Sequence, residues 1–124
     1  METQIWSKVE DKCAYILALR GSKVHRLKVT GSGSTLKRNV KFAMEALAAE
    51  RPPADAGAKS IESLDARTVV KAEVSPGNNS LTLHGGEDGL KTLTCTTGGW
   101  DADAILRTIL SQSGRTLQTA RWRP

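Results

Sequence analysis

Aromatic residues are scarce in this sequence: its 124 residues include three Trp, one Tyr and one Phe. An RNA-recognition-motif sheet needs paired aromatic residues on which two or three bases stack, and that pairing is missing here. Base stacking is therefore not expected to be the main way in which this chain would recognise a nucleic acid. Contacts to phosphate and to overall shape would remain.

Cysteines and long apolar runs are also few. Cys13 and Cys95 lie far apart in apolar segments, which favours free thiols in a reducing compartment over a single disulfide. No segment approaches the ~18 apolar residues of a membrane-spanning helix. The first twenty residues contain acids and lack the apolar stretch of a signal peptide. We therefore expect an intracellular protein, in the cytoplasm or nucleus, without a transmembrane segment.

The residue patterns of catalysis and metal binding are missing as well. His25 and His84 have no Cys, Asp or Glu at ligand spacing, and no Gly-x-Ser-x-Gly nucleophile elbow occurs. The acidic pairs Glu87/Asp88 and Asp101/Asp103 are typical of a turn and of a helix start. We expect no catalytic residue, no metal and no cofactor.

Charge is present and unevenly distributed. The formal net charge is +5. Residues 1–51 contain ten Lys or Arg against five Asp or Glu, whereas residues 52–124 contain eight of each. From Arg20 through Lys41 there are seven Lys or Arg and no acid. This distribution favours one positive surface and a polyanionic partner, either nucleic acid or an anionic membrane surface.

Hydrophobic periodicity and turn residues predict the order β-α-β-α-β-β-β-α. The predicted strands are Thr3–Ser7, Val24–Thr30, Ser60–Val74 with a break near Asp65, Ser80–His84 and Leu90–Thr96, and the predicted helices are Val9–Arg20, Ser34–Glu50 and Asp101–Ser113. Residues 52–59 are predicted to be an internal loop of a single domain over residues 1–114, followed by a basic tail over 115–124. The fold class is α+β, with helices on one face of a mixed sheet.

The turn Gly31-Ser32-Gly33 joins a strand to a helix, and this arrangement points backbone N–H groups and the positive helix end at one place. Lys37, Arg38 and Lys41 follow on the first turns of that helix. Two nucleotide-binding signatures begin in the same way, but Leu36 and Lys37 complete neither of them. Anion binding is favoured here, and the alternatives are a purely structural turn and a solvated basic face.

The segments Ala14–Leu19, Val24–Gly33 and Thr35–Leu47 resemble the Alba superfamily, over residues 3–50 of the chain. That superfamily includes chromatin proteins, RNA-binding proteins and small subunits of RNase P and RNase MRP. The resemblance implies a β-α-β-α-β-β two-layer sandwich, here extended by a C-terminal strand and helix. It also implies a homodimer or heterodimer that contacts nucleic acid through the loops before the two helices.

These observations predict a non-enzymatic nucleic-acid-binding protein, for RNA more than for DNA, with a ribonucleoprotein subunit as one form of it. The candidate contact residues are Lys8, Lys12, Arg26, Lys28, Gly31, Ser32, Gly33, Lys37, Arg38 and Lys41. The alternative starts from the second half, whose strands and final helix resemble a pleckstrin-homology-like module that binds anionic lipid or protein. The segment Ser34–Glu50 separates the two hypotheses, because a long helix there has no place in a pleckstrin-homology core.

Overall fold

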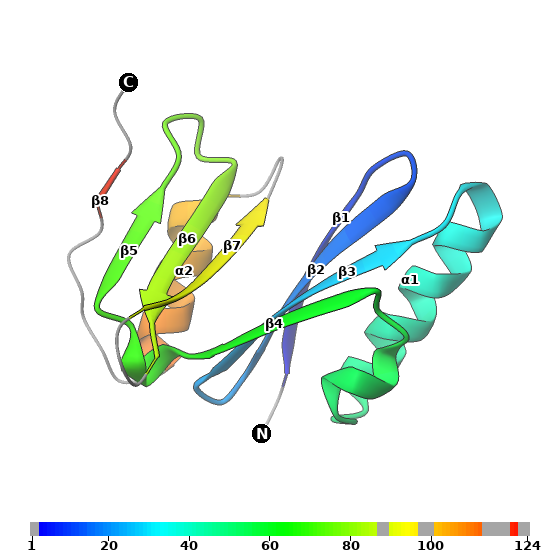
Figure 1. Cartoon of the computed structure of the whole chain (residues 1–124), viewed down its shortest axis with the longest axis horizontal. Coiled ribbons are helices and arrows are strands. Elements are labelled where there is room, and N and C mark those ends of the chain that lie inside the picture. The colour runs from blue at the N-terminus through cyan, green and yellow to red at the C-terminus, as the bar shows by residue number, and fades with distance from the viewer. Residues whose placement is uncertain (1–2, 87–89, 97–100, 113–119, 122–124) are drawn as a thin grey trace.

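The computed structural model describes residues 3–86, 90–96, 101–112 and 120–121, and Figure 1 shows their arrangement. In chain order the strands are β1 (Gln4–Val9), β2 (Cys13–Arg20), β3 (Lys23–Thr30), β4 (Ser60–Asp65), β5 (Lys71–Val74), β6 (Ser80–Gly85), β7 (Lys91–Thr96) and β8 (Ala120–Arg121). The helices are α1 (Gly33–Ala48) between β3 and β4, and α2 (Ala102–Gln112) between β7 and β8. Short 3-10 turns lie at Pro53–Ala56 and Ala66–Thr68.

The strands form two sheets. The first sheet is antiparallel in the order β1-β2-β3-β4. The second has the order β7-β6-β5-β8, in which β8 is a two-residue parallel edge strand. The fold is thus α+β, as the sequence predicted. The expected single mixed sheet is wrong, because the strands before and after Ala66–Thr68 belong to different sheets.

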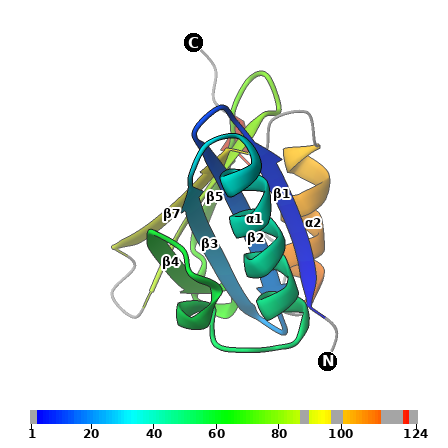
Figure 2. The same ribbon diagram turned by 90° about the vertical axis from the view of Figure 1, so that its right-hand side faces the viewer.

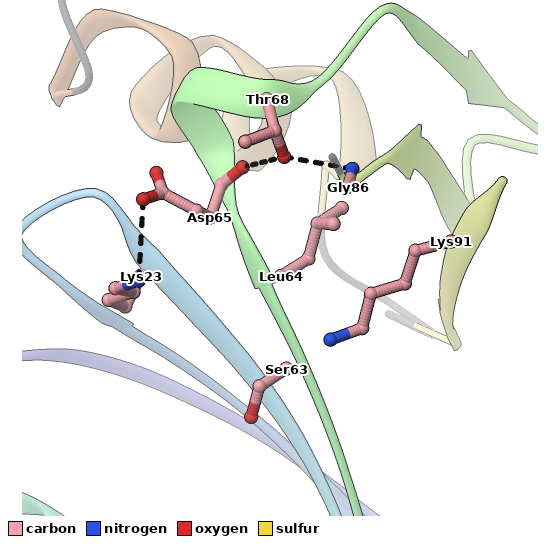
Figure 3. A pocket seen from close by; sticks show the side chains of 7 residues that line it. All are labelled: Lys23, Ser63, Leu64, Asp65, Thr68, Gly86 and Lys91. Atoms are coloured by element: carbon pink, nitrogen blue, oxygen red, sulfur yellow. Dashed lines mark hydrogen bonds and ion pairs between the residues drawn. The ribbon is translucent and has the colours of Figure 1, made fainter. Parts of the chain in front are cut away.

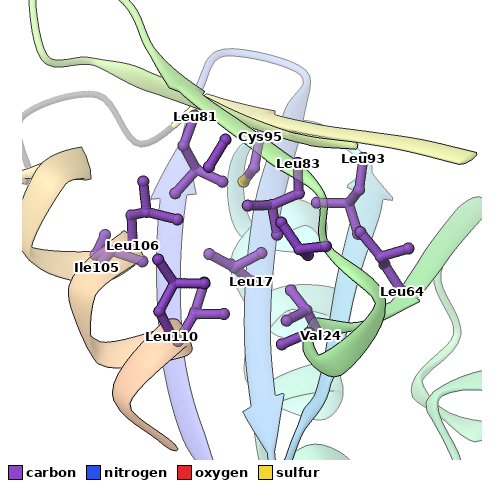
Figure 4. Packing of buried hydrophobic residues seen from close by; sticks show 14 of the residues in the cluster. Leu17, Val24, Leu64, Leu81, Leu83, Leu93, Cys95, Ile105, Leu106 and Leu110 are labelled. Atoms are coloured by element: carbon purple, nitrogen blue, oxygen red, sulfur yellow. The ribbon is translucent and has the colours of Figure 1, made fainter. Parts of the chain in front are cut away.

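The first sheet is buried on both faces. Helix α1 covers one face (Figure 2), where Ile16, Leu27 and Leu47 lie in the smaller hydrophobic core. The opposite face meets the second sheet and α2 around a larger core (Figure 4), to which Leu17, Leu83 and Leu106 contribute. The two helices therefore lie on opposite sides of the first sheet, which corrects the expectation that they share one face.

The helix predicted over Val9–Arg20 is wrong, because these residues form the end of β1, a turn and β2. Strand β2 is an inner strand of a sheet that is buried on both faces, and its residues 16–19 are all buried. A strand in this position is apolar at every residue, so it loses the alternation that identifies strands. Cys13, Ile16 and Leu17 then match helical spacing by chance.

Other predicted elements are confirmed within a few residues. They are β3, α1, the break after Asp65, the strands β6 and β7, and α2. The Alba topology is not confirmed, because the first helix of that fold is absent from residues 9–20. The predicted basic tail lies outside the described residues apart from Ala120 and Arg121. In the part of the chain that is described, no helix is long and apolar enough to cross a membrane.

Candidate functional site

The turn between β1 and β2 and the start of α1 meet at one end of the first sheet (Figure 2). The Gly31 N–H donates a hydrogen bond of 3.1 Å to the carbonyl oxygen of Lys12, which fixes the two segments together. We call this region the basic end. It comprises Lys8, Lys12, Lys28, Gly31, Ser32, Gly33, Lys37, Arg38 and Lys41.

The β3–α1 turn requires glycine for its shape. Gly31 has φ of +147° and Gly33 has φ of +57°, both in the left-handed region. A Cβ atom on Gly31 would lie 3.0 Å from the backbone nitrogen of Leu36. The Asn39 side-chain amide donates to the Thr30 carbonyl at 3.0 Å and holds the helix against the end of β3. The turn is therefore a tightly packed support for the start of α1.

The start of α1 is electrostatically uncompensated. Ser32 occupies the N-cap position in an extended conformation, and its side chain makes no capping hydrogen bond. The first turn of the helix contains no acidic residue. Because the first N–H groups of a helix lack intrahelical acceptors and carry partial positive charge, this end of α1 can donate hydrogen bonds to an anion or to water.

A second group of cations lies on the sheet face opposite α1. Lys8, Tyr15 and Lys28 are directly opposite one another in β1, β2 and β3, and residues in such a row share a face. All three side chains are half-buried, and the Lys28 Nζ atom lies 6.0 Å from the centre of the Tyr15 ring. The row thus places Tyr15 between two lysines on one face of the sheet, next to the larger core.

Sequence reasoning missed Tyr15, because the wrong helix placed it on a different surface from Lys28. The neighbouring Cys13 thiol raises the pKa of the Tyr15 phenol above its usual range. The ring is therefore neutral at physiological pH and does not repel phosphate. In a strand, Tyr15 shares a face with Cys13 and Leu17, so recognising β2 as a strand would have placed Tyr15 beside Lys28.

Arg26, one of the predicted nucleic-acid contact residues, is paired with an acidic residue of the neighbouring strand. Its guanidinium forms an ion pair of 3.2 Å with Glu62 on β4, and its side chain is 14% exposed. The Cζ atom of Arg26 also lies 5.9 Å from the centre of the Tyr15 ring. Its charge is therefore balanced locally, and its contribution is to hold β3, β4 and Tyr15 together.

The remaining six cations of the basic end form no ion pair with any described residue. They are Lys8, Lys12, Lys28, Lys37, Arg38 and Lys41. The ion pairs of the described chain lie elsewhere, for example Lys23–Asp65 and Lys71–Glu73. Glu10 and Asp11 share the β1–β2 turn with Lys12 and reduce the positive charge there. The basic end nevertheless groups six cations that have no ion pair with any residue the structure describes.

These cations do not form one flat surface. Lys8 and Lys28 project from the sheet face opposite α1, whereas Lys37 and Lys41 lie beside β1 on the helix side. Lys12 and the glycine turn lie at the end between them. A long anion would therefore have to bend around the end of the sheet to touch both groups.

A polar cavity of about 710 Å³ lies where β4 meets the second sheet (Figure 3). Its lining residues are Lys23, Ser63, Leu64, Asp65, Thr68, Gly86 and Lys91. Most of its polar groups bind one another: Asp65 pairs with Lys23 at 3.3 Å, and the Thr68 hydroxyl donates to the Asp65 carbonyl and accepts from the Gly86 N–H. Hydrogen bonding by Arg67 keeps the pKa of the Asp65 carboxyl well below its usual range. We therefore interpret this cavity as a structural junction.

Other titratable groups in the cores also have structural roles. Burial, followed by the charges of Arg20 and Lys23, lowers the pKa of His25, which exchanges a hydrogen bond of 2.7 Å with the Ser63 hydroxyl. Burial raises the pKa of the Cys95 thiol to about 11. Cys13 and Cys95 are both free thiols. Among the described residues, no three His, Cys, Asp or Glu side chains cluster closely enough to hold a metal ion.

Comparison of the chain with protein-family models, with curated proteins and with solved structures finds no match. The geometry of the basic end is therefore the basis for assigning a function.

Proposed function

We propose that this protein binds single-stranded nucleic acid, with RNA as the expected form, at the basic end. The observation that supports this proposal best is the group of six cations at the basic end, on both sides of the sheet end and next to an uncapped helix start, that form no ion pair with a described residue. Some cations elsewhere, such as Lys23, Lys71 and Arg107, have acidic partners. Arg51, Lys59 and Lys91 form no ion pair with a described residue. Uncompensated cations at one place repel one another, and a polyanion relieves that repulsion.

In this proposal, phosphate groups bind at the glycine turn. The N–H groups that open α1 donate to phosphate oxygens, and Lys12, Lys37 and Arg38 supply positive charge around them. Each phosphate neutralised on a single strand adds about 0.7 to the slope of log K against log[salt]. Binding therefore weakens steeply as salt is raised.

The row Lys8–Tyr15–Lys28 favours a single strand over a duplex. An unpaired base can stack on the exposed part of the Tyr15 ring while the adjacent phosphates lie near Lys8 and Lys28. Stacking on an aromatic side chain contributes about 1–3 kcal/mol per base, and a base inside a duplex cannot reach the ring. One tyrosine is a small platform, so phosphate contacts remain the larger part of the affinity.

A long helix over Ser34–Glu50 counts against the pleckstrin-homology-like alternative. Helix α1 spans sixteen residues in the segment that such a core cannot accommodate. Anionic lipid would meet the same cations as nucleic acid, so a lipid arm belongs in the experiment.

The test compares two double variants of equal charge change. We expect Lys37→Glu with Arg38→Glu to weaken binding of a labelled single-stranded RNA about tenfold or more, equivalent to about 1.4 kcal/mol, and to lower the salt slope by about 1.4. Lys91→Glu with Arg107→Glu removes the same charge from β7 and α2, and we expect it to retain the affinity. Fluorescence anisotropy over a salt series measures both quantities.

Two outcomes would refute the proposal. In the first, the α1 variant binds RNA as tightly as the unmodified protein. In the second, the protein pellets with phosphatidylserine vesicles and retains no RNA. Single-stranded DNA and duplex RNA of the same length serve as further ligands, and the proposal requires the single strands to bind more tightly than the duplex.

A further inference from the structure

An apolar groove of about 520 Å³ runs between α1 and β1, which lie side by side in Figure 2. Its apolar lining consists of Ile5, Val9, Val40, Met44 and Ala48, and its charged lining of Lys37, Lys41 and Glu45. Val9 is 50% exposed in this groove. On the helix side Val40 is buried, Met44 is half-buried and Ala48 is exposed, so the apolar lining of the groove is partly open to solvent.

The open groove coincides with an open sheet edge. Strand β1 is the edge strand of the first sheet, and among the described strands it pairs with β2 alone. It has six residues and contains no proline. An edge of this length presents unpaired backbone N–H and C=O groups to which another strand can add.

We infer that a second copy of this chain covers the groove, with the two β1 strands paired antiparallel about a two-fold axis at Ser7. In an antiparallel pair, opposite residues share a face. An axis at Ser7 sets Ile5 opposite the partner's Val9, so that the two apolar residues of β1 that line the groove meet their counterparts. The first sheets of the two copies then form one continuous sheet.

The charges on α1 fit the same axis. Helix α1 leaves the end of β3 and runs back along the sheet, antiparallel to β1. The strand part of the groove extends from Ile5 to Val9 and is centred on Ser7, while the helix part extends over residues 37–48 and is centred near Ala43. Lys41 and Glu45 flank Ala43, so the axis directs Lys41 toward the partner's Glu45 and Glu45 toward the partner's Lys41. In the dimer Lys41 therefore pairs with the partner, and the other five cations of the basic end remain for nucleic acid.

This self-complementarity is the reason for choosing a second copy over a different partner. One surface contains an open strand edge, apolar side chains symmetrical about one residue, and two opposite charges symmetrical about another. An isologous two-fold interface needs a patch that matches itself after rotation, and such dimers are the commonest oligomers. A binding groove for an unrelated acidic peptide would have no need for Glu45 on its wall.

The first experiment measures mass against concentration by sedimentation equilibrium over the micromolar to submillimolar range. We expect the unmodified chain to be a dimer that dissociates on dilution, and Val9→Glu to be a monomer throughout. Val70→Glu is the matched control, because Val70 is 63% exposed and lies outside the groove; this variant retains the dimer. A chain that is monomeric throughout, or a dimer that Val9→Glu leaves intact, would overturn the inference.

The second experiment locates the axis. In a Cys13→Ser background, Ser7→Cys brings two thiols together across the axis, and we expect a disulfide-linked dimer on mild oxidation. Thr94→Cys, on the edge strand β7 of the second sheet, is the control that stays monomeric on a reducing-agent-free gel. If a dimer forms in solution and the Ser7→Cys variant does not cross-link, the position of the axis is wrong.

Charge reversal tests the helix register. Lys41→Glu alone places two acidic pairs across the interface and Glu45→Lys alone places two basic pairs, so each lowers the dimer fraction. The double variant restores opposite charges and the dimer fraction with them. Failure of the double variant to recover the dimer would refute the antiparallel pairing of the two α1 helices.

Discussion

Replacing Gly31 by alanine tests how the β3–α1 turn supports the basic end. A Cβ atom at this position would lie 3.0 Å from the backbone nitrogen of Leu36 and 3.1 Å from its Cα atom. Both are backbone atoms of the first helical turn, so relief requires α1 to shift by a few tenths of an ångström. The φ angle of +147° adds backbone strain for any residue with a side chain.

Gly33→Ala is the matched comparison. Gly33 also has a left-handed φ of +57°, but a Cβ atom there would meet nothing within 4 Å. Its substitution should therefore cost only the backbone preference, about 1–2 kcal/mol. Gly31→Ala combines backbone strain of about 1–3 kcal/mol with the clash against Leu36, and we expect a total loss of about 2–4 kcal/mol.

Equilibrium unfolding in urea, followed by tryptophan fluorescence, measures both losses on the same scale. For a chain of this length, each kcal/mol corresponds to a change in Tm of about 3–5 °C. The Gly31 variant should also loosen the β1–β2 turn, because the Gly31 N–H donates to the Lys12 carbonyl. Equal stability of the two variants would refute the argument that α1 packs closely on Gly31.

Two further predictions concern Tyr15 and His25. Tyr15→Ala should weaken binding of single-stranded RNA by about 1–2 kcal/mol, whereas Tyr15→Phe should retain most of the affinity, because stacking needs the ring and not the hydroxyl. Fluorescence anisotropy titrations measure both affinities. Equal losses in the two variants would contradict stacking. The pKa of His25 is lowered in the folded chain mainly by burial, so between that value and the ordinary pKa of about 6.5 the unfolded chain binds the extra proton. Stability should therefore fall as pH drops from 7 through that window, and His25→Gln should lose this pH dependence in urea unfolding at a series of pH values. Carboxyl groups with a lowered pKa, such as Asp65, change the stability only at lower pH. An unchanged dependence of stability on pH in His25→Gln would therefore contradict the role of His25.

Several features of the fold followed from local patterns. The helix α1 was predictable because its apolar residues recur at helical spacing on one buried face while the other face is exposed. The glycine turn before it was predictable because few residues other than glycine adopt its backbone angles. Strand β3 was predictable because Leu27 and Val29 alternate with Arg26 and Lys28. The expected open basic face is wrong, because Val24 on that face is buried in the larger core.

The sequence by itself thus determined the cations at the start of α1, the amphipathic helices and the uneven charge, because each of these depends on residues close together in the chain. Only the tertiary structure decided the conformation of β2, since a strand buried on both faces has no polar side to reveal its period. It also decided that Arg26 pairs with Glu62 and that Tyr15 lies between Lys8 and Lys28. These relations join residues of different strands, and the pairing register that creates them depends on the packing of two sheets and two helices rather than on any local pattern.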